Sequence, residues 1–220
     1  MRKLITIVFL VIDIYSFGQP TLDTKYSSDV CACLDSIKAK GINEQNFSDC
    51  FQKAAMQNSG LILKETKQEY GDTSEESAYK FGKELAERIS ITLVKNCRTY
   101  FIITDSMRYD DYKNLNEDSI KFQLKDMEET EVSKQNDEFF SNKAMLYFEL
   151  KMYDSSFTNV EKALTINSDN IQGLYLKGWL NEIKGNYDDA ILLYDKVAEL
   201  TQVKSFYIFS EIAKRKKTGM

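Results

Sequence analysis

The chain has 220 residues, of which 43% are hydrophobic and 29% are charged, a composition that supports a folded core. It contains one proline and nine glycines, which favours long helices over a strand-rich fold with many turns. The formal net charge of −5 argues against nucleic acid as a partner. The absence of histidine excludes catalytic triads that use histidine, zinc sites with histidine ligands and haem held by histidine.

The first residues have the layout of a secretory signal peptide. A basic pair is followed by the apolar run Leu4–Ile12, and Ser16 and Gly18 are spaced like a cleavage site. The apolar run is shorter than the roughly 20 residues that an ordinary transmembrane helix needs. We therefore expect residues 1–18 to be removed and the protein to be periplasmic or secreted from a bacterium. An uncleaved segment would instead anchor the chain to a membrane.

Four cysteines lie in the N-terminal half, and an even number behind a signal peptide predicts two disulfides. Two of them, Cys31 and Cys33, point in different directions on a helix, so a bond between them would be strained. Of the three possible pairings we favour Cys33 with Cys50 and Cys31 with Cys97. A four-cysteine zinc site and a redox pair are the alternatives.

Residues 19–106 are expected to form a small helical bundle that these disulfides crosslink. The first helix is capped by Ser27 or Ser28 and ends at Gly41, because the apolar residues between them recur with helical spacing. The second helix runs as far as residue 71 and is bent or broken at Gly60.

A third helix is expected to begin near residue 73, where Thr73 and Glu76 form a capping box. Its apolar residues repeat at intervals of three and four from Phe81 to Cys97, which indicates a face buried in the bundle core. An exposed partner surface is the alternative interpretation of that stripe.

Residues 107–136 are expected to be an acidic connector. The stretch Met107–Glu138 carries ten acidic and five basic residues, and one amphipathic helix is predicted around Asp118–Glu131. The domain boundary is placed between Met107 and Asn116.

The C-terminal half contains an internal repeat. The segments 137–170 and 171–204 are each 34 residues long and align without a gap. Small residues and aromatic residues recur at matching offsets in both segments: Ala144 with Gly178, Tyr153 with Tyr187, Ser156 with Ala190, and Ala163 with Val197.

This pattern resembles the tetratricopeptide repeat, a helix-turn-helix unit of that period. The resemblance implies an all-α fold in which a small residue stands at each helix crossing and an aromatic residue follows each turn. The sequence departs from the pattern where the closing proline is replaced by Ser168 and Gln202. Because two repeats are fewer than normally stand alone, we expect caps: residues 205–220 form a helix with a basic tail at one end, and the connector helix or the bundle covers the other. The basic cluster of that tail, residues 214–217, is interpreted as a solubilising helix end.

The resemblance also implies that the first helix of each repeat lines a concave surface for peptides or partner helices. On this chain those positions are apolar, aromatic or acidic: Ser141, Met145, Phe148, Tyr175, Trp179 and Glu182. The alternative for Trp179 is that it packs against the connector helix.

The leading hypothesis is an exported adaptor or scaffold that docks an unidentified protein or peptide through this groove and uses no cofactor. A structural subunit of a cell-envelope complex is the alternative. An accessory part of an enzyme is less favoured, because the chain has no nucleophile elbow, phosphate loop or metal-binding histidine pair.

Overall fold

The computed structural model describes residues 21–110, 112, 115–130 and 132–219, and the expected signal peptide lies outside these residues. The expectation of an all-α fold is confirmed: this part of the chain contains helices and turns but no strand. The α-helices are α1 Leu22–Ile37, α2 Glu44–Gln57, α3 Ser59–Tyr70, α4 Glu75–Asn96, α5 Arg98–Asp110, α6 Glu117–Glu128, α7 Asp137–Glu149, α8 Tyr153–Ile166, α9 Ile171–Ile183, α10 Tyr187–Thr201 and α11 Tyr207–Lys217.

The first helix starts earlier than its expected cap. Thr21 is the N-cap, and its hydroxyl accepts a hydrogen bond from the backbone N–H of Thr24 at 3.3 Å. Ser27 lies inside the helix, where its hydroxyl donates to the carbonyl of Asp23 at 2.6 Å. The prediction of Ser27 or Ser28 as the cap is therefore wrong, because the buried face of the helix already begins at Leu22.

Both long helices expected in the bundle are interrupted, and at positions that contain no glycine. Asn58 separates α2 from α3, since its buried amide donates to the carbonyl of Ala54 and to the carboxylate of Asp29. Gly60 lies inside α3, so the prediction that it bends or breaks the helix is wrong; the break is two residues earlier. Cys97 separates α4 from α5 with an extended backbone, φ −110° and ψ 111°.

The start of the third helix also differs from the prediction. Ser74, one residue after Thr73, is the N-cap of α4, and its hydroxyl accepts from the N–H of Ser77. Asp72 holds that hydroxyl in place by accepting its hydrogen bond at 2.8 Å. A preceding carboxylate therefore selects the cap here.

The two disulfides have the expected pairing. Cys31 is bonded to Cys97 and Cys33 to Cys50, with Cα–Cα distances of 5.6 and 5.5 Å. They tie α1 to the α4–α5 junction on one side and to α2 on the other. The core between these helices is built from aliphatic and aromatic side chains such as Val30, Leu34, Phe81, Ile89 and Leu93.

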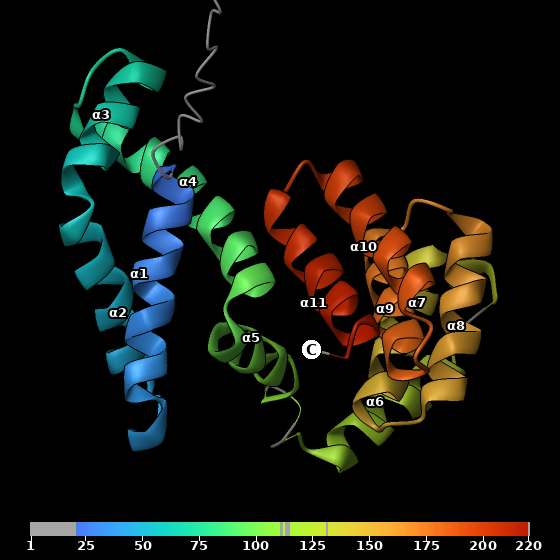
Figure 1. Ribbon diagram of the computed structural model, residues 1–220. Coiled ribbons are helices and arrows are strands. Elements are labelled where there is room, and N and C mark those ends of the chain that lie inside the picture. Colours follow the sequence, from blue (N-terminus) through green and yellow to red (C-terminus); the bar gives the residue numbers. More distant parts are fainter. Residues whose placement is uncertain (1–20, 111, 113–114, 131, 220) are drawn as a thin grey trace, which may run out of the picture.

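The C-terminal half consists of two antiparallel hairpins, α7 with α8 and α9 with α10 (Figure 1). α6 packs against α7 at the start of this stack, and α11 packs against α10 at its end. α11 also packs against α4, so it stands between the hairpins and the disulfide-linked helices (Figure 1).

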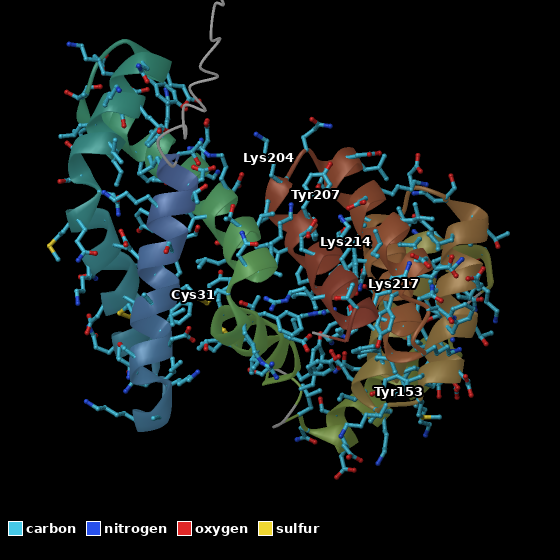
Figure 2. The ribbon with its side chains drawn as sticks, viewed as in Figure 1. Cys31, Tyr153, Lys204, Tyr207, Lys214 and Lys217 are labelled. Atoms are coloured by element: carbon cyan, nitrogen blue, oxygen red, sulfur yellow. A yellow bond between two sulfur atoms is a disulfide. The ribbon has the colours of Figure 1, made fainter. Side chains whose placement is uncertain are left out.

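The basic residues of α11 connect the two halves of the molecule. The guanidinium of Arg215 donates to the carbonyls of Val94 and Cys97 at 2.7 and 3.1 Å. Lys214 and Lys217 lie along the same helix (Figure 2), each paired with an acidic side chain. The interpretation of this cluster as a solubilising end is therefore wrong for Arg215, because its guanidinium binds carbonyls at the junction of α4 and α5.

Within the described residues, no helix has both the length and the apolar character that a bilayer crossing requires.

Candidate functional site

The helix crossing of each hairpin is built from the small residues found in the sequence. In the first hairpin Ala144 is fully buried, and the hydroxyl of Ser156 donates to its carbonyl at 2.8 Å. In the second hairpin Gly178 lies against the ring of Tyr194, where an added Cβ would come within 2.9 Å of the Cε1 atom. These contacts require small side chains because the helices approach closely.

The other repeat-signature residues lie at the same interfaces. Ala163 and Ala190 are fully buried, and Tyr153 and Tyr187 are partly buried at the starts of α8 and α10. The ring of Tyr153 lies 5.6 Å from that of Phe148, so it fills the wedge between the helices of its hairpin.

The six residues expected to line a binding groove are mostly covered. Ser141, Phe148, Trp179 and Glu182 are between 1% and 5% exposed, and Met145 and Tyr175 are partly buried. The chain itself covers them. Trp179 and Glu182 are contacted by the C-terminal end of α5, and Tyr175 is contacted by Phe206 and Phe209.

Arg108, from α5, occupies the centre of this surface. Its Nη1 atom donates to both carboxylate oxygens of Glu182 at 3.0 and 3.1 Å, and its Nη2 atom donates to the Tyr194 hydroxyl at 2.9 Å. The Tyr194 hydroxyl in turn donates to Glu182 at 2.9 Å. The side chains of Arg108 and Glu182 are only 5% and 1% exposed, so this is a buried ion pair.

Two further charges complete the cluster. Lys216 of α11 pairs with Glu182 at 2.8 Å and with Asp105 of α5 at 2.7 Å. The cluster thus contains two cations and two carboxylates, supplied by α5, α9 and α11. The opposite charges offset part of the cost of burying Arg108 and Glu182.

Aromatic rings enclose the same point. The Arg108 guanidinium lies 4.7 Å from the ring centre of Trp179 and 5.1 Å from that of Phe209. Trp179 also donates from its Nε1 atom to the Tyr109 hydroxyl at 3.3 Å, and its ring meets Tyr112 at 5.5 Å. Trp179 therefore packs inside the chain. Its contacts are with the end of α5 and with Tyr112, not with the connector helix α6 that the alternative interpretation names.

Burial and charge shift the ionisation of these groups. Burial disfavours the charge on Arg108, but attraction to Tyr194 and Glu182 outweighs it and raises the pKa of the guanidinium. Burial raises the pKa of Tyr175 to about 12 and raises that of Tyr194 well above its ordinary value. Both phenols therefore stay neutral across the physiological range, and Arg108 keeps its charge.

One part of the surface stays open. A pocket of about 410 Å³ lies between α6, α7 and α9. Its apolar side chains are Phe122, Met127, Met145 and Leu146, and its polar ones are Gln123, Asp126, Asn142 and Gln172. Met145 is thus an expected groove residue that lines an open pocket. Phe148, another of them, lines a second pocket of about 340 Å³ beside Tyr109 and Tyr153.

The sequence reasoning missed the residues that fill the groove. Arg108 falls in the stretch predicted to be an acidic connector, and Lys216 falls in the cluster interpreted as a solubilising helix end. The available signal was an arginine flanked by Met107 and Tyr109, with Tyr112 one helical turn on. A charged residue among aromatic ones at this spacing indicates a mixed face that packs against a partner.

Within the described residues, no group of three or more histidine, cysteine or acidic side chains is placed to hold a metal ion. The four cysteines are all disulfide-bonded.

Consecutive antiparallel helical hairpins crossing at small residues define a helical-repeat protein, a class that mediates protein–protein interaction and is typically non-catalytic. The tetratricopeptide repeat family model matches residues 138–170 and 171–203, so the chain carries two tetratricopeptide repeats. Comparison with curated proteins and with solved structures found no match.

Proposed function

We propose that this protein is an exported adaptor that docks a segment of another protein in the pocket between α6, α7 and α9. The observation that carries the proposal is the position of Met145: it belongs to the first helix of a tetratricopeptide repeat, yet it faces an open cavity beside exposed Phe122. Trp179 and Glu182, two other residues of the expected groove, are covered by the end of α5 and Tyr112.

The chemistry of the pocket suits an extended peptide with one large apolar side chain. Met127, Met145 and Leu146 provide an adaptable apolar lining, and Phe122, which is 73% exposed, is available to cover a bound group. Carboxamides from three different helices, Gln123, Asn142 and Gln172, stand around this lining. Such groups both donate and accept hydrogen bonds, as a peptide backbone requires.

The proposed location is the periplasm or the outside of a bacterial cell. Its support is the pair of disulfides, which persist in oxidising compartments and are rare in the cytosol. Intact mass of the protein from a secreting host, with and without reduction, tests this. Loss of residues 1–18 together with a mass four hydrogens below that of the reduced form is expected, and a full-length chain with four free thiols would contradict it.

The docking proposal is tested by Met145→Glu, which places a charge inside the pocket. Photo-crosslinking at position 122 in the native host identifies the contacting protein, and titration of the purified pair then measures affinity. We expect Met145→Glu to weaken binding by about tenfold or more. The matched control is Leu192→Glu, because Leu192 lies outside the pocket on α10 and is 68% exposed.

Equal binding by both variants and the parent would reject the pocket as the docking site. Alanine at Trp179 is not a useful test, since that ring is 2% exposed and its loss would disturb the core. The alternative role, a structural subunit of an envelope complex, is favoured by exposed apolar side chains such as Ile166 and Leu192 on the second helices of the repeats. Self-association that Leu192→Glu abolishes and Met145→Glu leaves intact would support that role instead.

A further inference from the structure

The end of α5 packs on the surface where a tetratricopeptide repeat is expected to bind its partner. The part of this surface that surrounds Arg108, formed by Trp179, Glu182, Tyr194 and Phe209, is called the concave centre. The first turns of α5 belong to the disulfide-linked bundle, where Tyr100 and Phe101 are buried. Farther along the helix, Ile102 and Met107 are more than half exposed, and the side chains that reach the repeats and α11 are Asp105, Arg108 and Tyr109. Three side chains of α5 therefore make its contact with the repeats and α11.

The surface that receives Arg108 is selective for a guanidinium. A carboxylate and a phenol hydroxyl accept from two different nitrogens of its planar fork. Three rings surround the same group, with the centres of Trp179, Phe209 and Tyr194 at 4.7, 5.1 and 5.8 Å. An ammonium would match neither the two directions nor the flat stacking surface as well.

Two features make this contact exchangeable. The Nε atom of Arg108 is buried and has no hydrogen-bond partner among the described residues, so α5 is an imperfect ligand for the site. Lys216 stays paired with Glu182 through α11, so the carboxylate would keep a cation if Arg108 left.

We propose that the concave centre is an arginine-binding site, which Arg108 of α5 fills within the same chain. The partner that binds this site is a helix of another protein, and it presents an arginine directly followed by an aromatic residue. Such a helix would displace the end of α5. This inference rests on the proposed docking role of the repeats, but it concerns a different surface from the pocket at Met145.

The single tryptophan of the chain makes the test direct, because Trp179 lies against the guanidinium. The chain with Arg108→Ala is titrated with a synthetic peptide of residues 98–109, and with the same peptide carrying norleucine in place of the arginine at position 108. We expect the arginine peptide to change Trp179 emission and raise the Tm, and to bind roughly tenfold or more tightly than the norleucine peptide. The unaltered chain should bind the arginine peptide roughly tenfold or more weakly, because α5 competes for the site.

Equal affinity for the two peptides, or no binding of either to the Arg108→Ala chain, would overturn the proposal and make Arg108 a fixed part of the core. If that variant does not fold, Arg108→Lys is used with the same peptides, since it keeps a cation beside Glu182 while losing the planar fork. Met145→Glu serves as the second control: it should leave the peptide titration unchanged, so failure at the pocket and failure at the arginine site are distinguishable.

Discussion

The two halves of this molecule are stabilised by different means. The bundle of α1 to α5 has a core of aliphatic and aromatic side chains closed by two disulfides, and its ion pair between Arg88 and Asp23 is about 30% exposed. The repeats contain no cysteine, and their interior is aromatic, with a buried ion pair between Arg108 and Glu182. One half relies on covalent links, whereas the other relies on a polar cluster that another segment of the chain completes.

The difference follows from what each half lacks. The bundle has no repeating unit whose neighbours would bury its faces, and a small core of this kind benefits from crosslinks. The repeats have a regular interface, but two of them leave both ends open. α6 and α11 cover those ends, and α5 covers the concave face. The repeats therefore depend on segments that lie outside the 34-residue period.

The largest effect is expected when the buried pair is broken. Glu182→Gln leaves Arg108 and Lys216 facing a neutral amide away from water, which should cost about 3–5 kcal/mol of unfolding free energy. Asp23→Asn breaks the corresponding pair in the bundle, and its partial exposure limits the loss to about 1 kcal/mol. Chemical denaturation of both variants measures the difference, and similar losses would show that the two pairs do not differ as described.

The next largest losses of stability are expected when the disulfides are removed, and the disulfide that closes the longer loop should contribute more. The Cys31–Cys97 bond spans 66 residues and the Cys33–Cys50 bond spans 17. Loop entropy then predicts losses of about 4 and about 3 kcal/mol when each pair is replaced by alanine. Denaturation of the two double variants under oxidising conditions tests this ranking. A reversed ranking would indicate that strain or residual structure outweighs the loop term.

The sequence was sufficient for those parts of the fold that depend on local pattern. The 34-residue period located α7 to α10, because small residues at fixed offsets are needed wherever two helices cross. The directions of Cys31 and Cys33 on one helix disfavour a bond between them, which leaves two pairings, and the structure contains the one that the sequence analysis favours.

The rest depends on particular contacts, some between close neighbours in the chain and others between distant residues. The break at Cys97 and the cap at Ser74 arise from neighbouring side chains and backbone that no helical period encodes. The covering of the groove is the larger omission: Arg108 and Glu182 are 74 residues apart, and in the sequence each resembles an ordinary surface charge. Charge patterning along a helix cannot identify a partner on another helix.

The third expected effect concerns alkaline pH. Burial raises the pKa of Tyr175 to about 12, whereas in the unfolded chain it lies near 10.0. Above pH 10 the unfolded state therefore loses its proton first, and stability should fall by about 2–3 kcal/mol as the pH rises from about 10 to about 12. Tyr175→Phe should flatten this part of the stability curve. The matched control, Tyr79→Phe, removes an exposed phenol of the bundle and should leave the curve in place.

The smallest effect compares two glycines, one from each half. Gly178→Ala puts a methyl group 2.9 Å from the Cε1 atom of Tyr194, whose ring is held by its hydrogen bonds to Arg108 and Glu182 and has little freedom to move. Overpacking outweighs the gain in helix propensity, so a net loss of about 1–2 kcal/mol is expected. Gly82→Ala, on the exposed face of α4 with nothing within 4 Å of the new group, should stabilise the protein by about 1 kcal/mol. Thermal unfolding of the two variants measures both signs. A gain at position 178 would mean that Tyr194 can shift without cost, and the polar cluster would then be looser than its hydrogen bonds indicate.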